Sequence, residues 1–516
     1  MTLKQPLPTW VGALTALTLA VWVWVSVLSR GYVEIGPDEG MEMAKALLLA
    51  KAPAEANRAW SDQPWLYAKV LSWLWQVSGH EWLAGRLFTV LVASAWLLVI
   101  SRLMPRGCSA IHGLWGGLFL VTWPQFLPLS CSMMVEVPCI GLATLALVPL
   151  MGVRRLTLWH CAGSAVLAGV ATSLKLVALL ALPAWLIAVA QAGQATTHHS
   201  GNPAEANHAV VSATRRLIVW SAAFLVVVGC LLPIGPGGPQ QWLLLPHLRS
   251  ERLLWQTGDS LHAFSPSLLL PTASALVSAA VGLALLRKQG RLREAAVPAA
   301  LLVVPLVVHS FHRPFWSYYL LHFASGAAAL GGWGLGEILR QTWQELRRPR
   351  VGEATTHFER HLIAGTLLGA AWFSVDVDRS LLDLQRLQGN QRLRESVLVQ
   401  TLKQAVPRIH HAYSRDSAFL AQANCLAVPK LTITPLKRFW SGDLTETQVL
   451  DLVSEQLPEA LLLRVDRELG DPAWQRLLTA RYTHVVTDRG LALYLHQVDG
   501  VTPRRGAGEY LRSLGL

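Results

Sequence analysis

The chain has 516 residues, of which 52% are hydrophobic and 15% are charged, and its formal net charge is +12. In a soluble protein of this length about a quarter of all residues would be charged, so the composition excludes an ordinary soluble protein. The six cysteines show no spacing typical of a disulfide framework or of a metal site.

The apolar residues are concentrated in blocks of about 15 to 22 residues, which as helices can cross a hydrocarbon core of about 30 Å. The first block, 9–28, is too long and too rich in tryptophan for a cleaved signal peptide, so we interpret it as a retained anchor. We therefore predict an all-α polytopic membrane domain with about eleven transmembrane helices. The sequence leaves the boundaries near 159–191 and 361–377 open. The expected spans are 9–28, 83–101, 112–129, 134–152, 159–173, 176–191, 216–234, 266–286, 295–310, 318–338 and 361–377.

The basic residues follow the pattern of membrane topology, in which cytoplasmic loops carry an excess of lysine and arginine. From a cytoplasmic N-terminus every second loop is basic, whereas the first outer loop, 29–81, carries seven acids against five bases. This distribution explains the positive charge without a nucleic-acid partner and indicates a multi-pass protein of the cell inner (plasma) membrane. The basic loops contain Arg102 and Arg106; Arg154 and Arg155; Arg215 and Arg216; Arg287, Lys288, Arg291 and Arg293; and Arg340, Arg347, Arg348 and Arg350.

Two polar parts of the chain are large enough to carry function. The loop 29–81 contains amphipathic runs at 38–51 and 64–78, which we expect to lie as helices along the outer membrane surface. The odd number of spans places 378–516 on the same side as a soluble domain, after a transmembrane domain of residues 1–377. The stretch 192–214, rich in alanine, threonine, histidine and asparagine, is typical of a flexible linker.

The C-terminal domain is predicted to be small and α/β. Its β-like runs are 460–465, 484–486 and 491–495, the last after the turn formed by Asp488, Arg489 and Gly490. Helical runs at 446–457 and 472–480 separate the strands.

An acidic pair, Asp38 and Glu39, follows the first span directly. The structural interpretation is a helix cap, with Glu42 close to capping-box spacing. The functional interpretation is a carboxylate at the membrane surface that acts as a general base. The residues alone leave both interpretations open.

A second polar cluster in the first outer loop contains Asp62, Gln63, Tyr67 and Lys69. Pro64 in its middle suits the first turn of a helix, so the cluster can be a helix start or part of a binding site.

Two ionisable residues lie near the outer ends of spans, namely Glu136 and Lys175. A charge at that depth needs water or a partner, so each is a candidate for function. Snorkelling to the interface is the alternative for Lys175.

A last cluster precedes the tenth span and contains His312, Arg313, Tyr318 and Tyr319. Its cations and hydroxyls could bind a phosphate at the level of the lipid headgroups, and interfacial anchoring is the alternative.

The order of these features resembles the GT-C membrane glycosyltransferases, in particular the bacterial protein O-mannosyltransferase-like and lipid A aminoarabinose transferase-like branch. The matching features are the first-loop Asp-Glu, the Asp-Gln-Pro-x-Leu-Tyr segment at 62–67, the Gly-Arg-Leu at 85–87, the acid at 136 and the lysine at 175. The resemblance covers roughly 10–340, and 436–445 is similar to the outer soluble domain of that branch. Trp65 departs from the family pattern, which commonly has a second proline there.

The resemblance implies an inverting transfer of a sugar from a polyprenyl-phosphate carrier to a lipid, protein or glycan acceptor on the outer face. It implies that Asp38 is the catalytic base, with Glu39 in support, and that Glu136 is the second acidic position. Cations must then stabilise the leaving phosphate, and the candidates are Arg86, Lys69, Lys175 and Arg313. The resemblance leaves a divalent metal open, because relatives differ in metal dependence.

Two alternatives remain at the level of the sequence. A lipid-linked-sugar transporter or flippase would also explain spans and buried charges, although we find no inverted repeat. A surface-polysaccharide polymerase is the other alternative. The sequence identifies neither the sugar nor the acceptor, and it does not give the oligomeric state.

Overall fold

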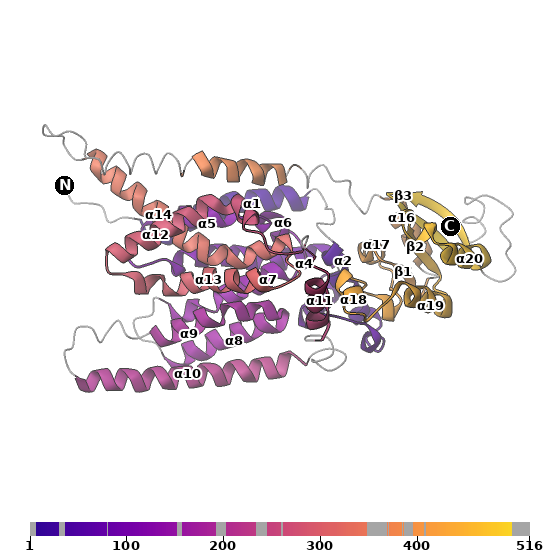
Figure 1. The fold of residues 1–516 in the computed structure, drawn as a ribbon, viewed down its shortest axis with the longest axis horizontal. Coiled ribbons are helices and arrows are strands. Elements are labelled where there is room, and N and C mark those ends of the chain that lie inside the picture. The colour runs from indigo at the N-terminus through magenta and orange to yellow at the C-terminus, as the bar shows by residue number, and fades with distance from the viewer. Residues whose placement is uncertain are drawn as a thin grey trace.

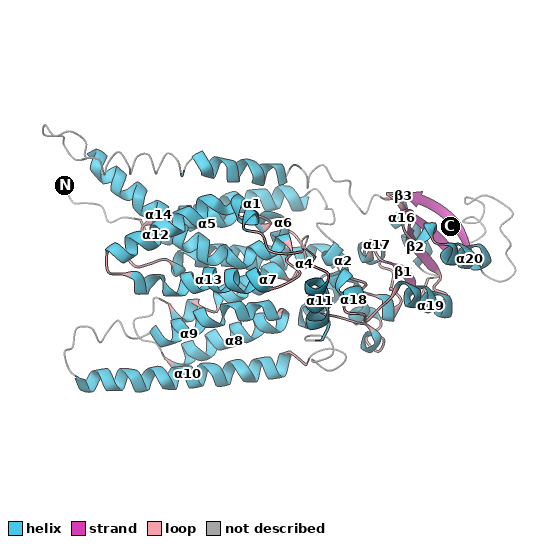
Figure 2. Ribbon diagram, viewed as in Figure 1, coloured by secondary structure: helices cyan, strands magenta, loops and turns pink. Residues whose placement is uncertain are grey.

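The fold was analysed in a computed structural model of the whole chain. The described residues are 7–29, 37–79, 81–151, 157–191, 203–233, 245–259, 262–347, 369, 371–383, 385, 396–406 and 409–497. A bundle of long helices forms one end of the molecule, and a small domain with a β-sheet forms the other (Figures 1 and 2).

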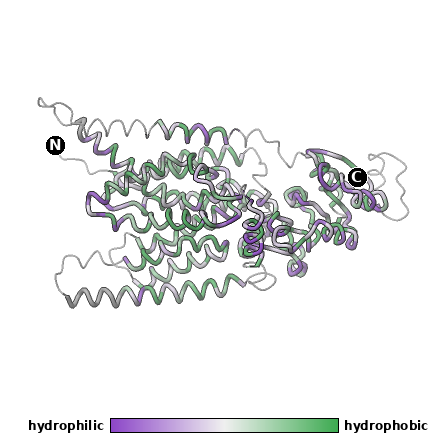
Figure 3. The backbone as a smooth tube through the Cα atoms, in the orientation of Figure 1, coloured by the Kyte–Doolittle hydropathy of each residue, from purple (hydrophilic) through white to green (hydrophobic). Residues whose placement is uncertain are grey.

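Helices cover ten of the predicted membrane spans. Five are long and apolar enough to cross a membrane, and they run over Thr9–Ser29, Trp82–Leu103, Ala213–Leu231, Pro266–Lys288 and Leu292–Phe311. The other five regions contain shorter apolar segments or, at the end, a long Gly- and Ala-rich helix. These are Ala110–Val121, Glu136–Leu150, Leu158–Leu174, Leu176–Gln191 and Leu321–Arg347. Hydrophobic residues dominate the bundle (Figure 3).

The last predicted span, 361–377, lies partly outside the described residues. Residues 371–383 are helical, so the described helix continues beyond the expected end of that span.

The helical path is broken in two apolar regions, once inside a predicted span and once between two predicted spans. The span predicted at 112–129 consists of α5 (Ala110–Val121) and α6 (Phe126–Ser130), and Gln125 between them has a left-handed backbone with φ 66°. Lys175 separates α8 (Leu158–Leu174) from the 3-10 helix η3 (Leu176–Ala181), which continues as α9 (Leu182–Gln191). The division of 159–191 into two segments is therefore confirmed.

The linker prediction for 192–214 is wrong in its second half. Helix α10 (Pro203–Leu231) begins at Pro203, in the stretch we expected to be flexible. Proline suits the first helical position, and the alanine-rich sequence that follows has high helix propensity. Residues 192–202 lie outside the described part.

Small residues let the bundle helices approach one another closely. Helix α14 (Leu321–Arg347) packs on α5 and on α12 (Ala273–Lys288). A Cβ atom added at Gly332 would lie 2.4 Å from the backbone nitrogen of Gly116, and one at Gly334 would lie 2.1 Å from the carbonyl oxygen of Ser278. Glycine is required at these two positions because the backbones touch there.

The C-terminal domain contains a four-stranded sheet in the order β1-β2-β4-β3. The strands are β1 (Ala412–Ser414), β2 (Ala460–Arg464), β3 (Tyr482–Asp488) and β4 (Leu491–His496). β1 pairs in parallel with β2, and the other pairs are antiparallel. The predicted small α/β domain is confirmed, including the turn before β4, where Arg489 and Gly490 have φ values of 53° and 72°.

Helices cover the sheet and complete this domain. They are α16 (Val397–Ala405), α17 (Ser417–Gln422), α18 (Leu436–Trp440), α19 (Glu446–Gln456) and α20 (Pro472–Arg481). Two hydrophobic cores, one around Leu493 and one around Leu461, fill the space between helices and sheet.

The C-terminal domain docks directly on the segment between α1 (Thr9–Ser29) and α4 (Glu81–Leu103). Helix α17 packs on α2 (Pro37–Lys51) so closely that a Cβ at Gly40 would lie 2.5 Å from the backbone nitrogen of Ala418. The indole nitrogen of Trp60 donates a hydrogen bond to Asp443 at 3.2 Å. In Figure 1, α2, α11 (Leu245–Gln256) and α18 lie between the bundle and the sheet.

Candidate active site at the junction of the two domains

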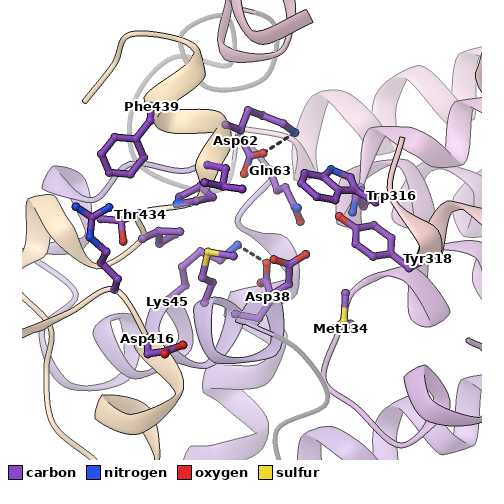
Figure 4. A pocket seen from close by; sticks show the side chains of 18 of the residues that line it. Asp38, Lys45, Asp62, Gln63, Met134, Trp316, Tyr318, Asp416, Thr434 and Phe439 are labelled. Carbon is purple, nitrogen blue, oxygen red and sulfur yellow. Dashed lines mark hydrogen bonds and ion pairs between the residues drawn. The ribbon is translucent and has the colours of Figure 1, made fainter. Parts of the chain in front are cut away.

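A pocket with a volume of about 630 Å³ lies at this junction. Its walls come from α2, the 61–63 loop, the segments around residues 125–134 and 316–319, and the C-terminal domain (Figure 4). Of the predicted site residues, Asp38, Asp62, Gln63, Lys175, Tyr318 and Tyr319 line it. Parts of the chain more than 350 residues apart therefore share one cavity.

One face of α2 points into the pocket. Asp38, Met41, Glu42 and Lys45 line it, at the i, i+3, i+4 and i+7 spacing that places residues on one side of a helix. Lys45 pairs with Glu42 at 2.5 Å.

Asp38 has no hydrogen bond or ion pair with any described residue, and it lies in the first turn of α2 after Pro37 rather than at a cap position. Burial raises the pKa of Asp38 to about 6, and the charge of Glu136 adds to this effect while Lys175 opposes it. A carboxylate with a pKa of about 6 is suited to accept a proton near neutral pH. The cap interpretation thus has no hydrogen bond to support it in the described part of the chain.

Glu39 points away from the pocket and forms a buried ion pair with Arg86. The guanidinium Nε and Nη2 atoms each donate to the carboxylate at 3.0 Å, and the backbone N–H of Met133 donates to Glu39 Oε1, also at 3.0 Å. The pair joins α2 to α4 (Glu81–Leu103) and to the segment before α7 (Glu136–Leu145). Neither residue lines the pocket.

Glu136 accepts a hydrogen bond from Lys175, the residue at the break between α8 and η3. The Lys175 ammonium lies 5.5 Å from the centre of the Tyr318 ring. Lys175 and Tyr318 line the pocket, whereas Glu136 lies behind the lysine. The two predicted intramembrane charges are therefore partners of each other.

Asp62 forms an ion pair across the domain junction. Its carboxylate accepts from Lys437 Nζ of α18 at 2.8 Å, and its backbone carbonyl lies 3.0 Å from His247 Nε2 of α11. Burial raises the pKa of Asp62, but Lys437 and His247 outweigh this effect and hold it well below its usual range. Burial and the charge of Lys437 lower the pKa of His247 to about 4, so this imidazole is neutral at pH 7.

Aromatic side chains form a further wall of the pocket. The rings of Trp316 and Tyr318 are stacked with their centres 6.5 Å apart, and Trp440, outside the pocket lining, also stacks on Trp316 at 6.1 Å. Flat aromatic faces of this kind provide apolar contact area next to polar groups.

Besides Arg86, four predicted binding residues lie outside the pocket lining. Tyr67 is buried in the bundle and Lys69 is exposed. Arg313 donates to the carbonyl oxygen of Asp259 at 2.9 Å and lies 4.0 Å from the centre of the Trp255 ring, while His312 faces Glu251 at 3.5 Å. These last two residues anchor the loop after α11.

Several charged pocket residues were not predicted from the sequence. Glu42 was considered only for its capping-box spacing, and Lys45 and His247 were not among the predicted site residues. The C-terminal domain adds Lys437 and a network in which Arg415 pairs with Glu446 and Glu468, and Arg467 pairs with Glu446 at 2.6 Å. The only sequence signal for these residues was the similarity of 436–445 to the soluble domain of the GT-C branch.

No group of three or more histidine, cysteine, aspartate or glutamate side chains that could hold a metal ion occurs within the described residues.

No protein-family model matches the sequence, and no curated protein matches it. Solved structures do match in fold. The chain is similar to ArnT from Cupriavidus metallidurans, solved bound to undecaprenyl phosphate, with a TM-score of 0.58 and 13% identity over 95% of this chain and 99% of that one. It is also similar to the oligosaccharyltransferase of Archaeoglobus fulgidus, with a TM-score of 0.53 and 10% identity over 95% of this chain and 75% of that one.

These similarities extend over both the helical bundle and the C-terminal domain. At such low identity they establish the fold and not the activity. The chain is a membrane protein with the GT-C fold, as the motifs in its first outer loop led us to expect.

Proposed function

We propose that this protein is a glycosyltransferase that moves a sugar from a polyprenyl-phosphate carrier to an acceptor hydroxyl. The observation that carries the proposal is Asp38, a carboxylate without an ion-pair partner among the described residues, in a pocket that also holds lysines. Two neighbours in fold support the choice of carrier, since ArnT was solved with undecaprenyl phosphate and the archaeal oligosaccharyltransferase AglB with a dolichol-phosphate and an inhibitory peptide.

In the proposed reaction, Asp38 accepts the proton of the acceptor hydroxyl as its oxygen attacks the anomeric carbon of the donor. The bond between that carbon and the phosphate oxygen breaks on the opposite face, so the configuration is inverted. The polyprenyl phosphate leaves with the bonding electrons, and the Lys175 ammonium stabilises the charge that develops on it. The proton on Asp38 is then lost to water.

The remaining predicted residues receive supporting roles. Glu136 holds Lys175 in place, and the Glu39–Arg86 pair fixes the first turn of α2, from which Asp38 projects. Gln63, Tyr318 and Tyr319 line the space left for the sugar. We keep residues 1–377 as the transmembrane domain and 378–516 as the soluble one, with the pocket on the outer face of the plasma membrane.

The proposal is tested by analysing lipid-linked sugars by mass spectrometry. Cells that lack the gene should accumulate a polyprenyl-phosphate sugar, and the wild-type gene should remove it. A gene carrying Asp38→Asn should leave the accumulation unchanged although the variant protein is present in the membrane. If no lipid-linked sugar accumulates in either strain, the proposed function is wrong.

A further inference from the structure

Lys437 is held at the pocket by contacts on both sides of the domain junction. Its carbonyl oxygen accepts a hydrogen bond from Ser250 of α11 at 3.1 Å, which fixes the backbone of α18. The next residue, Arg438, donates to the carbonyl oxygens of Lys430 and Ile433 at 2.7 and 2.9 Å. The lysine thus projects from a rigid support, and its side chain is only 11% exposed.

The Lys437 ammonium uses two of its donors within the protein. One donates to Asp62 at 2.8 Å, and one donates to Nδ1 of the neutral His247 at 3.3 Å. An ammonium group has three N–H donors, so one remains without a partner among the described residues. Because Lys437 lines the pocket, this donor is available to a ligand there.

Lys437 also lies close to Lys175. Burial lowers the pKa of Lys437, but Asp62 and Tyr319 outweigh this effect and raise it, while the charge of Lys175 acts in the lowering direction. Lysines from the two domains therefore line the same pocket, and their charges act on each other. Two like charges kept this near to each other are typical of a site that binds an anion.

The charge balance of the pocket shows why direct contacts matter. Four acids line the pocket, namely Asp38, Glu42, Asp62 and Asp416, together with six bases, namely Lys45, Lys175, Lys437, Arg415, Arg464 and Arg467. When Glu136 behind Lys175 is added, six bases stand against five acids, so the charges nearly cancel when all are ionised. Such a nearly balanced pocket attracts an anion only weakly at long range. A phosphate must instead be bound by ammonium donors at short range, and the loss of one donor should have a large effect.

We propose that Lys437 of the C-terminal domain and Lys175 of the bundle together bind the phosphate group of the lipid-linked donor. This inference rests on the proposed function, and it makes the C-terminal domain part of the donor site. The docked arrangement of the two domains is then the binding-competent one, because only docking brings the two lysines to the same pocket.

The test measures the affinity of the purified full-length protein in detergent for undecaprenyl phosphate, with undecaprenol as the uncharged probe. Lys437→Met should weaken undecaprenyl phosphate binding by about 10- to 100-fold, the range for loss of a charge-assisted hydrogen bond. Undecaprenol binding should stay within about twofold, because it has no phosphate. A matched control is Arg249→Gln, which removes the exposed interdomain pair with Asp443 and should leave both affinities unchanged.

The variant Asp62→Asn distinguishes phosphate binding by Lys437 from a purely structural role in which Lys437 only holds the two domains together. This variant removes a negative charge beside Lys437, so it should bind undecaprenyl phosphate at least as tightly as the wild type. If Lys437 serves only to hold the domains together, Asp62→Asn and Lys437→Met should weaken binding alike, and our inference is overturned. It is overturned equally if Lys437→Met binds undecaprenyl phosphate normally.

The two proposals can fail separately. Normal carrier binding by Lys437→Met, combined with loss of transfer in Asp38→Asn, would reject the phosphate site and keep the glycosyltransferase. Lys437-dependent carrier binding without sugar accumulation in the deletion strain would keep the phosphate site and reject the transfer reaction.

Discussion

At the scale of the residue, the decisive feature is that Asp38, unlike its neighbours, forms no ion pair with any residue that the structure describes. Every other carboxylate of the α2 and 61–63 walls has a lysine partner, Lys45 for Glu42 and Lys437 for Asp62. Lys437 holds Asp62 in its charged form, which makes it a poor proton acceptor, whereas burial raises the pKa of Asp38 to about 6. Burial also raises the pKa of Glu42, but Lys45 donates a hydrogen bond to its carboxylate. Within this pocket, Asp38 is therefore the carboxylate suited to accept a proton, whereas Glu42 and Asp62 are paired with lysines.

Asp38→Asn should abolish sugar transfer while the protein remains folded and binds the lipid carrier. A general base contributes on the order of 10² to 10⁴ in rate, and the amide has nearly the same size. Transfer rates of the purified variant, beside those of the exposed-site control Asp451→Asn, measure the effect. Wild-type turnover in Asp38→Asn would show that another group accepts the proton.

The pH dependence of the reaction should follow Asp38. Its pKa of about 6 means that kcat/KM should fall about tenfold per pH unit below pH 6, as the base becomes protonated.

The same residue should make stability depend on pH. Because the folded-state pKa is raised, ionised Asp38 destabilises the fold above about pH 6, and this penalty disappears as the pH falls towards 4. Asp38→Asn should therefore raise the melting temperature at pH 7, by the equivalent of about 1–3 kcal/mol, and have no effect near pH 4. Equal melting curves at pH 7 would mean that Asp38 is not desolvated.

At the scale of the element, α2 is held from two sides. Glu39 and Arg86 fix it to the bundle by a buried pair whose side chains are 0% and 3% exposed. At Gly40, the next residue, α17 of the C-terminal domain packs closely against the backbone of α2. The position of Asp38 is thus the result of contacts made by its immediate neighbours on other faces of the helix.

Removal of one partner of the buried pair should unfold the protein rather than stop the chemistry alone. Glu39→Leu removes the carboxylate that accepts two hydrogen bonds from the buried Arg86 guanidinium, at a cost of about 3–5 kcal/mol. Thermal unfolding in detergent should show a strongly lowered melting temperature, and the double variant with Arg86→Leu should recover most of it. If Glu39→Leu melts like the wild type and loses only transfer, Glu39 takes part in the reaction directly.

Gly40→Ala should weaken docking of the C-terminal domain. The added Cβ would lie 2.5 Å from the backbone nitrogen and 2.7 Å from the Cα of Ala418, so the helices must separate, at a cost of about 1–3 kcal/mol. Faster release of the C-terminal domain by limited proteolysis and weaker carrier binding are the expected results. Gly163→Ala, where the Cβ meets no atom within 4 Å, is the matched control and should behave as the wild type.

At the scale of the whole molecule, the proposed orientation predicts which sites react with a membrane-impermeant thiol reagent. In a variant without the native cysteines, single cysteines at Ala54 and Glu455 should be labelled in intact cells, because both positions are exposed and belong to the proposed outer side. A cysteine at Gln289, which is exposed in a basic loop, should be labelled only after lysis. Labelling of Gln289 in intact cells would reverse the orientation.

Local patterns in the sequence determined much of this protein. Ten apolar blocks of membrane length are helical, as expected. A chain that crosses the bilayer must satisfy its backbone hydrogen bonds internally, and a helix does this within one segment. The β-like runs at 460–465, 484–486 and 491–495, with the Asp488–Gly490 turn, correctly predicted β2, β3 and β4. Asp38 was singled out by its position directly after the first span, and it does line the pocket.

Only the tertiary structure decided which charges are paired and which remain available. Glu39 and Asp38 are adjacent in sequence, yet one is buried against Arg86 and the other faces the pocket, since successive residues of a helix point in different directions. Lys437 lies 375 residues from Asp62, and no local pattern can indicate such a contact. The fold rests on local hydrophobic periodicity, whereas the pocket depends on the docking of two domains, which brings distant side chains together.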